Sequence, residues 1–346
     1  MLLKISLTIV ICFNCFLLCH GDEIQLRPKF ITKEVETTID KALAYLVKNQ
    51  ARSGLWYANG RSGGYPCAMT SLAGLALLAS GNTPLEGKYA INVQRAVQYV
   101  LSCTNESGLI SNMSQEQRSM YGHGFAMMFL GQVYGMGTDD ATQRRIRKVL
   151  KKAIKLTAKS QSSEGGWLYE PDSNGDEGSV TITQIQGLRS CRNAGFKVPK
   201  KVITRACEYI SKCSNSDGGI AYSLGSRGAS RPAITAAAVA TLYNAGKYDN
   251  KVAVKALDFL LKTHNFDSKR LKGGHAFYMM MYLSQAMYFS HKKNWARYFP
   301  NIRDALVKAQ NTEGSWNGDY VGRVYGTSIG LLVLQLPYSY LPLFQR

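Results

Sequence analysis

The pattern Gln-x-x-x-Gly-x-Trp occurs three times in the chain, as QARSGLW at 50–56, QSSEGGW at 161–167 and QNTEGSW at 310–316. Each copy follows a segment with one apolar face and precedes a segment that is apolar or small nearly all round. Because one seven-residue loop returns in the same setting, we interpret the chain as an array of repeated units.

Six units of about 55 residues each can be aligned by these loops and their glycines. The first segment of each unit is apolar on one side and charged on the other, which predicts a helix that faces solvent on one side. The predicted first helices are 38–48, 93–101, 146–157, 202–210, 252–261 and 302–309. The second segments lack a charged face, so we expect them to be enclosed. They are 68–78, 124–134, 180–189, 233–243, 276–288 and 327–336.

Such helix pairs close most simply as an inner ring of second helices inside an outer ring of first helices. We therefore predict an all-α protein, an α/α toroid of six helix pairs. It forms a single domain over residues 22–346, with the repeats spanning about 31–337.

Residues 1–21 have the form of a signal peptide. Lys4 precedes an apolar run over 5–18, and Cys19-His-Gly21 offers a cleavage site. No later segment reaches about 18 uninterrupted apolar residues, so we expect no membrane span. The prediction is an exported protein, periplasmic or extracellular after cleavage near residue 21. Five cysteines follow this segment, an odd number that leaves at least one unpaired if the others pair internally.

The chain is basic, with 42 Lys and Arg against 23 Asp and Glu and a formal net charge of +19. Such a charge favours solubility or an anionic partner. The segment 144–155 is the most basic helix, and two interpretations are open for it: a solvated outer face, or peripheral contact with an anionic membrane. No nucleic-acid-binding motif is present, so we expect no nucleic acid partner.

The three loops resemble the QW repeats of squalene and oxidosqualene cyclases, and the six-pair plan resembles the protein prenyltransferase β-subunit. The resemblance runs from about Ile31 to Pro337. A closer resemblance is to exported bacterial proteins, particularly of planctomycete type, that carry prenyltransferase/squalene oxidase repeats. It implies that the glutamines and tryptophans of the loops tie the outer helices together.

A terpene cyclase of this superfamily would carry an Asp-x-Asp-Asp acid motif, which is absent here. The nearest positional match is Gly175-Asp-Glu-Gly-Ser-Val-Thr181, where Asp176 or Glu177 is a candidate catalytic acid whose pKa a neighbouring carboxylate would raise. The alternative is that these residues only cap the helix that follows. A prenyltransferase-like zinc site would need Asp-x-Cys, which precedes no inner helix, so we expect no metal and no cofactor.

Units three apart share residue types just before their second helices. In order of units these residues are Arg61, His123, Asp176, Arg231, His275 and Asp319. In a closed ring each histidine would lie beside an acid of the next unit, His123 by Asp176 or Glu177 and His275 by Asp319. Such pairs can tune a proton donor or acceptor. The alternative is that both histidines only pack at the helix starts.

Tyr121, Tyr278 and Tyr325 are expected near the same mouth, where their rings can face cations or sugars. Methionines and aromatic residues of the second helices either fill the core or line an apolar cavity that suits an isoprenoid. Three functions remain open. The first is an exported terpene-cyclase-like protein that binds an isoprenoid or lipid, or cyclises it with a carboxylic acid as proton donor. The second is a non-catalytic binding or scaffold toroid, and the third is a carbohydrate-active toroid that acts on an acidic polysaccharide. A glycosidase would need two carboxylates about 5–10 Å apart.

Overall fold

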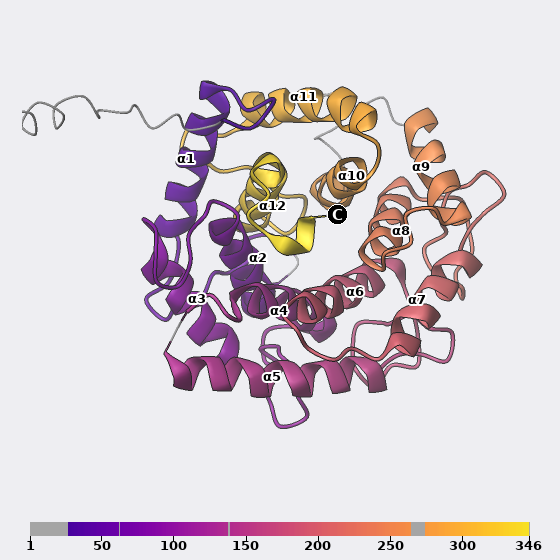
Figure 1. Cartoon of the computed structure of the whole chain (residues 1–346), viewed down its shortest axis with the longest axis horizontal. Helices are drawn as coiled ribbons and strands as arrows, with labels where there is room; N and C mark the ends of the chain where they lie inside the picture. The colour runs from indigo at the N-terminus through magenta and orange to yellow at the C-terminus, as the bar shows by residue number, and fades with distance from the viewer. Residues whose placement is uncertain (1–26, 62, 138, 264–273, 346) are drawn as a thin grey trace, which may run out of the picture.

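The computed structural model describes residues 27–345 except 62, 138 and 264–273 (Figure 1). The predicted signal peptide therefore lies outside the described residues. The described chain forms twelve α-helices and no strand. The outer helices are α1 (Lys33–Lys48), α3 (Ala90–Ser102), α5 (Asp140–Lys159), α7 (Lys200–Lys212), α9 (Lys251–Thr263) and α11 (Lys292–Ala309). The inner helices are α2 (Pro66–Leu78), α4 (Ser119–Val133), α6 (Gly178–Asn193), α8 (Pro232–Asn244), α10 (Ala276–Phe289) and α12 (Arg323–Gln335).

The inner helices form a closed ring. Each one contacts the next, and α12 returns to contact α2. Figure 1 looks down the axis of this ring and shows the odd-numbered helices outside it. The predicted α/α toroid of six helix pairs is confirmed, with both helices of most pairs starting a few residues earlier than predicted.

Burial follows the predicted division between the two rings. All thirteen residues of α2 are buried, whereas α5 buries one stripe that includes Ile146 and Leu150. The arginines and lysines of 144–155 are exposed on the opposite side of α5 and form no ion pair with a described residue. Membrane contact by this face stays a prediction. Within the described chain, no helix is both long and apolar enough to cross a membrane.

The three Gln–Trp loops join neighbouring outer helices. The Gln161 side chain donates to the Gly165 carbonyl in its own loop at 2.8 Å and to the Val202 carbonyl of α7 at 2.9 Å. The Trp167 indole N–H donates to the Thr157 carbonyl of α5 at 2.8 Å. Gln50 and Gln310 make the same pair of bonds, to Asn92 of α3 and Thr38 of α1. The loops therefore tie outer helices together, as the resemblance implies.

The loop glycines are required by space as well as by backbone angle. Gly165 has a φ of 102°, in the left-handed region that favours glycine. A side chain on Gly165 would also collide with the backbone carbonyl of Arg205 in α7. Gly54 and Gly314 meet α3 and α1 in the same way, so the motif glycine sets how closely a loop approaches the next outer helix.

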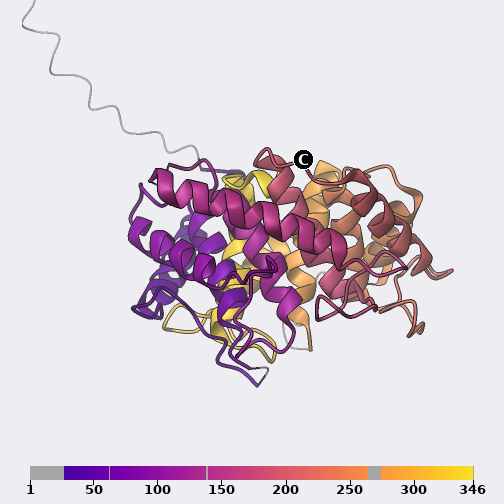
Figure 2. The same ribbon diagram turned by 90° about the horizontal axis from the view of Figure 1, so that it is seen from below.

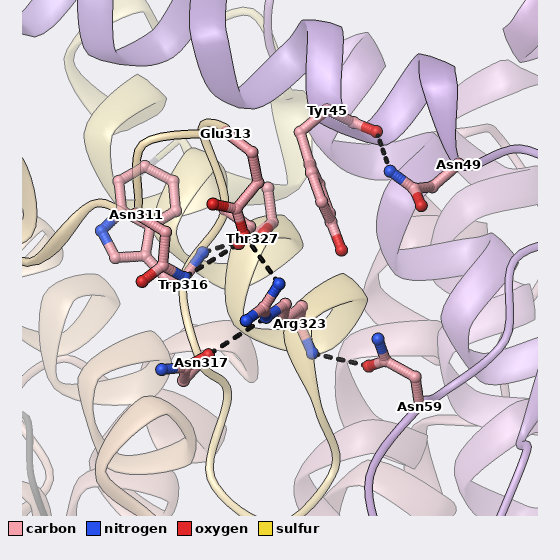
Figure 3. Close-up of polar contacts among 10 residues, drawn as sticks. Tyr45, Asn49, Asn59, Asn311, Glu313, Trp316, Asn317, Arg323 and Thr327 are labelled. Carbon is pink, nitrogen blue, oxygen red and sulfur yellow. Dashed lines mark hydrogen bonds and ion pairs between the residues drawn. The ribbon is translucent and has the colours of Figure 1, made fainter.

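The last and first units meet through polar contacts at the start of α12 (Figure 3). Within the last unit, the Arg323 guanidinium binds the Glu313 carboxylate at 2.9 Å, and the Arg323 backbone N–H donates to the Asn59 side chain of the first unit at 2.8 Å. The Gly60 N–H also donates to the Val321 carbonyl at 2.9 Å. These contacts fix the α11–α12 loop against the first unit.

The C-terminal tail closes one end of the ring. After α12 the chain forms the short helices η2 (Leu336–Tyr338) and η3 (Pro342–Phe344), and η3 contacts α4 and α6. Leu343 and Phe344 are buried there, at the end of the molecule where Figure 2 shows the C-terminus. Farther inside, the amide of Gln186 on α6 donates to Gln285 on α10, a polar link across the ring.

Candidate functional site

A cavity of about 440 Å³ lies at the N-terminal ends of the inner helices. All six inner helices contribute residues from their first two turns, so the cavity sits on the axis of the ring. Its tyrosines are Tyr65, Tyr121, Tyr169, Tyr222, Tyr278, Tyr320 and Tyr325. Its apolar residues are Ala68, Met69, Phe125, Ala233, Ile234 and Val321. Its other polar residues are Arg118, Ser179, Arg231, His275 and Asp319.

Six of the ten predicted site residues line this cavity. They are Tyr121, Arg231, His275, Tyr278, Asp319 and Tyr325. The other four are not among the lining residues: Arg61, His123, Asp176 and Glu177. Arg61 is an exposed neighbour of the rim, and its backbone N–H donates to the Tyr320 carbonyl at 2.8 Å.

Asp319 is the single carboxylate among the described residues that line the cavity. It lies in the loop before α12, yet its carboxylate accepts the backbone N–H groups of Phe277 and Tyr278 at 3.2 Å each, and so caps α10. Burial raises the pKa of Asp319, while those two bonds and the charge of nearby His275 act in the opposite direction. His275 is the N-cap residue of α10, with a φ of 68°. An acid and a histidine thus share one wall of the cavity.

Glu177 lies behind the cavity wall and caps α6. Its carboxylate accepts the backbone N–H groups of Val180 at 2.7 Å and Ser179 at 2.9 Å. The Tyr121 hydroxyl donates to it at 3.3 Å and also meets the Ser179 hydroxyl. Burial raises the pKa of Glu177. Of the two roles considered for this residue, the geometry shows the helix cap, with Tyr121 and Ser179 between its carboxylate and the cavity.

Asp176 faces away from the cavity. Its carboxylate accepts the Leu224 N–H at 3.4 Å, and its side chain lies beside Gly166 and near Tyr209 of α7. Asp176 and Glu177 therefore diverge into different surroundings although they are adjacent in the chain.

His123 is fully buried between α4 and α5. Its Nδ1 accepts the Ile110 N–H at 3.1 Å, so its Nε2 carries the proton and donates to the Thr157 hydroxyl at 3.0 Å. Burial lowers the pKa of His123 to about 4. Its hydrogen-bond partners are thus Ile110 and Thr157, in place of the expected Asp176 or Glu177.

The alignment that gave His123 and His275 one register is wrong. His123 is the fifth residue of α4, whereas His275 precedes α10 as its N-cap. The similar Gly-His-x-Phe sequences suggested that the two histidines are equivalent. However, α4 begins four residues before His123, whereas α10 begins one residue after His275. One histidine therefore points into the core and the other reaches the cavity.

An arginine–tyrosine arch spans part of the cavity rim. The Arg118 guanidinium lies 4.3 Å from the centre of the Tyr169 ring, and that of Arg231 lies 4.7 Å from the centre of the Tyr222 ring. The hydroxyls of the two tyrosines are 2.5 Å apart and hydrogen-bonded. We call these four residues the arch.

Sequence reasoning missed three members of the arch, Arg118, Tyr169 and Tyr222. A signal was present for the tyrosines. Tyr169 and Tyr222 each stand two residues after the last residue of a loop, Trp167 and Ile220, and so share one repeat position. Arg118 corresponds to Arg231, since each is the N-cap residue of its inner helix. Elsewhere in the described chain, no group of three or more His, Cys, Asp and Glu residues could hold a metal ion.

Comparisons with known proteins agree with this architecture. The sequence matches the prenyltransferase alpha-alpha toroid domain over residues 15–192 and the squalene-hopene cyclase C-terminal domain over residues 128–299. No curated protein matches the chain.

Solved structures of the same fold include two kinds of enzyme. A variant of the type II terpene cyclase MstE from Scytonema, in complex with its product merosterolic acid A, has a TM-score of 0.61 at 12% identity, covering 88% of this chain and 97% of that one. Another variant, in complex with the substrate geranylgeranyl dihydroxybenzoate, has a TM-score of 0.59 at 14% identity, covering 89% and 98%. The GH76A α-1,6-mannanase of Salegentibacter sp. HEL1_6 has a TM-score of 0.63 at 8% identity, covering 88% and 99%.

Proposed function

The chain belongs to the prenyltransferase α/α-toroid family, and from this premise we propose that it binds an isoprenoid or a similar lipid in the axial cavity. The observation that carries the proposal is the lining: apolar and aromatic side chains from five of the six inner helices and from the loops before them, with Asp319 as the single carboxylate among the described lining residues. A volume of about 440 Å³ is typical of small-molecule sites. The MstE complexes, which hold a geranylgeranyl substrate and its product in the same fold, support this ligand class.

The ligand is an amphiphile with an acidic end. Met69, Phe125 and Ile234 are buried parts of the lining, whereas Arg118 and Arg231 are exposed at the rim. An apolar chain fits against the first group. A carboxylate or phosphate fits beside the guanidinium groups of the second, whose planar arrangement of N–H donors matches such anions.

If this protein also converts its ligand, Asp319 is the proton donor. It is the carboxyl group that faces the cavity, and burial favours its protonated form. His275 in the same wall can return a proton to it. Glu177 supports Tyr121 from behind the wall.

The binding proposal is tested by purifying the protein natively and analysing extracted small molecules by mass spectrometry. We expect an acidic isoprenoid or lipid to be retained, and added geranylgeranoic acid to bind in titration calorimetry. The variant Ala233→Trp fills the cavity from a partly exposed position and should lose at least tenfold in affinity. The control Val254→Trp, on the exposed side of α9, should bind normally. Equal binding by the two variants would place the ligand elsewhere.

The proton-donor proposal is tested with Asp319→Asn. If a polyprenyl substrate is cyclised, this variant should still bind it but lose at least 100-fold in turnover, the scale of general acid catalysis. A thermal melt checks that α10 remains capped. Loss of turnover in Glu177→Gln with retention in Asp319→Asn would assign the donor to Glu177 instead.

An acidic oligosaccharide is the second candidate ligand, because seven tyrosine rings and two arginines line the cavity. Aromatic faces stack on sugars, and the arch is cationic. A pair of lining carboxylates, as glycosidases use, is not found among the described residues. The same extraction distinguishes the candidates, since retained sugar without lipid favours this one, and retention of neither favours a scaffold. Export of the protein is a further proposal, tested by N-terminal sequencing of the secreted chain.

A further inference from the structure

Cys67 and Cys103 meet where α2 packs against α3. Cys67 is the second residue of α2, and Cys103 is the C-cap of α3. Both lie against one peptide group: the Ile110 carbonyl is 3.7 Å from the Cys67 sulfur, and the Ser111 N–H donates to the Cys103 carbonyl at 3.1 Å. A side-chain hydrogen bond joins the two thiols.

We propose that Cys67 and Cys103 are a disulfide-forming pair. The packing of α2 on α3 places both residues against the Ile110–Ser111 peptide group, and their side chains interact with each other. No such interaction joins two of the other cysteines of the described chain. The other cysteines there are Cys191, Cys207 and Cys213. This inference does not rest on the ligand proposed above.

The two thiols differ in a way that orders the reaction. The hydrogen bond from Cys67 lowers the pKa of Cys103, which is partly exposed, while that bond and burial raise the pKa of Cys67. Cys103 therefore supplies the first thiolate. With glutathione disulfide as the oxidant, Cys103 attacks one of its sulfurs and releases a glutathione thiolate. Cys67 then loses its proton, attacks the Cys103 sulfur and releases the second glutathione.

The bond would fix one wall of the cavity. Ala68 and Met69, which line it, directly follow Cys67. The connection from α3 to α4 is already held near its far end, where the buried Glu116 carboxylate accepts the Ala68 N–H at 3.0 Å. A disulfide at Cys103 holds the near end of the same connection. The connection from α3 to α4, which ends at Arg118 of the arch, would then be attached to α2 at both of its ends.

The repeats supply a matched control. Cys213 is the C-cap of α7, as Cys103 is of α3. Thr70 of α2 and Thr181 of α6 are equivalent, because each accepts the backbone N–H of its loop tryptophan. Cys67 stands three residues before Thr70, so the equivalent position on α6 is Gly178. Cys213 thus has the same backbone setting with glycine in place of a facing thiol.

The test equilibrates the full chain with glutathione disulfide, alkylates it under denaturing conditions and maps its peptides by mass spectrometry. We expect one linked peptide pair, Cys67 with Cys103, and alkylation of the other three cysteines of the described chain. Reduction by dithiothreitol should then lower the thermal midpoint by about 3–6 °C. Cys103→Ser and Cys67→Ser should abolish that redox shift, and Cys213→Ser should retain it.

Three results would overturn the proposal. One is alkylation of both Cys67 and Cys103 after treatment with the oxidant. Another is a link from either residue to a different cysteine. The third is a Cys103→Ser variant whose thermal midpoint still falls on reduction as far as that of the parent protein. The first two results come from peptide mapping of the parent protein, which identifies the linked cysteines directly. They therefore remain decisive even if a cysteine variant folds poorly.

Discussion

His123 occupies a position that threonine fills in four other units. The last residue of a loop donates its backbone N–H to an inner-helix side chain, and the threonine acceptors are Thr70, Thr181, Thr235 and Thr327. In the second unit the acceptor is His123, and its second nitrogen reaches Thr157 of α5. The imidazole must be neutral to accept the Ile110 N–H, because a protonated ring has no lone pair on Nδ1.

This role predicts a pH dependence of stability. Burial lowers the pKa of His123 to about 4, against 6.5 for an ordinary histidine. Below pH 6.5 the unfolded chain therefore binds a proton that the folded chain does not. The free energy of unfolding should fall by about 1.4 kcal/mol per pH unit from this residue until pH 4 is approached.

Urea unfolding of the parent protein and of His123→Gln between pH 7 and pH 4 measures this contribution. The variant is less stable at neutral pH but should lose stability less steeply as the pH falls. Gln94→Ala, on an exposed face of α3, should leave the slope unchanged. Parallel curves for His123→Gln and the parent would show that His123 is not the titrating group.

At the scale of the helix, two of the three predicted acids, Glu177 and Asp319, bind helix N-termini in different ways. Glu177 caps the helix that follows it, and this local contact keeps it behind the wall. Asp319 caps α10, a helix of the preceding unit, from the α11–α12 loop. Backbone N–H groups at a helix N-terminus stabilise a carboxylate in either case. Only the second arrangement brings a carboxylate into the cavity, because it draws a loop across the mouth of the ring.

At the scale of the whole molecule, closure depends on contacts between the two ends of the repeat array. Gln310 donates to the Thr38 carbonyl of α1 at 2.8 Å, and α12 packs against α2. The last unit thus makes with the first the contact that Gln161 makes between its neighbours α5 and α7. We expect the contact between the two ends of such a ring to be as strong as the contacts between its other units.

We therefore expect Gln50→Ala, Gln161→Ala and Gln310→Ala to lose similar stability. Each leaves two carbonyls without their donor, which costs about 1–3 kcal/mol in the free energy of unfolding. Chemical denaturation followed by circular dichroism measures the loss, and Gln94→Ala on an exposed face of α3 should change it little. If Gln310→Ala behaved like Gln94→Ala, the closing contact would contribute nothing to stability.

The sequence alone determined the all-α toroid, its six pairs and the roles of the Gln–Trp loops. These features depend on the local periodicity of apolar residues and on a loop motif that recurs along the chain. The interpretation of one unit therefore supports the interpretation of the others. Six of the ten proposed site residues reach the cavity for the same reason, since they stand just before or within the first turns of the inner helices.

Tertiary structure decided which of those residues share the cavity. A helix that starts a few residues later turns its side chains to another side, which sends His123 into the core while His275 stays at the mouth. The arch and the Asp319 cap arise from loops that fold over the ring from separate units. The Cys67–Cys103 contact likewise joins two helices through packing. The Gln–Trp loops fix the spacing of the outer helices. The candidate site lies at the axis of the ring, where the connecting loops bring its residues together.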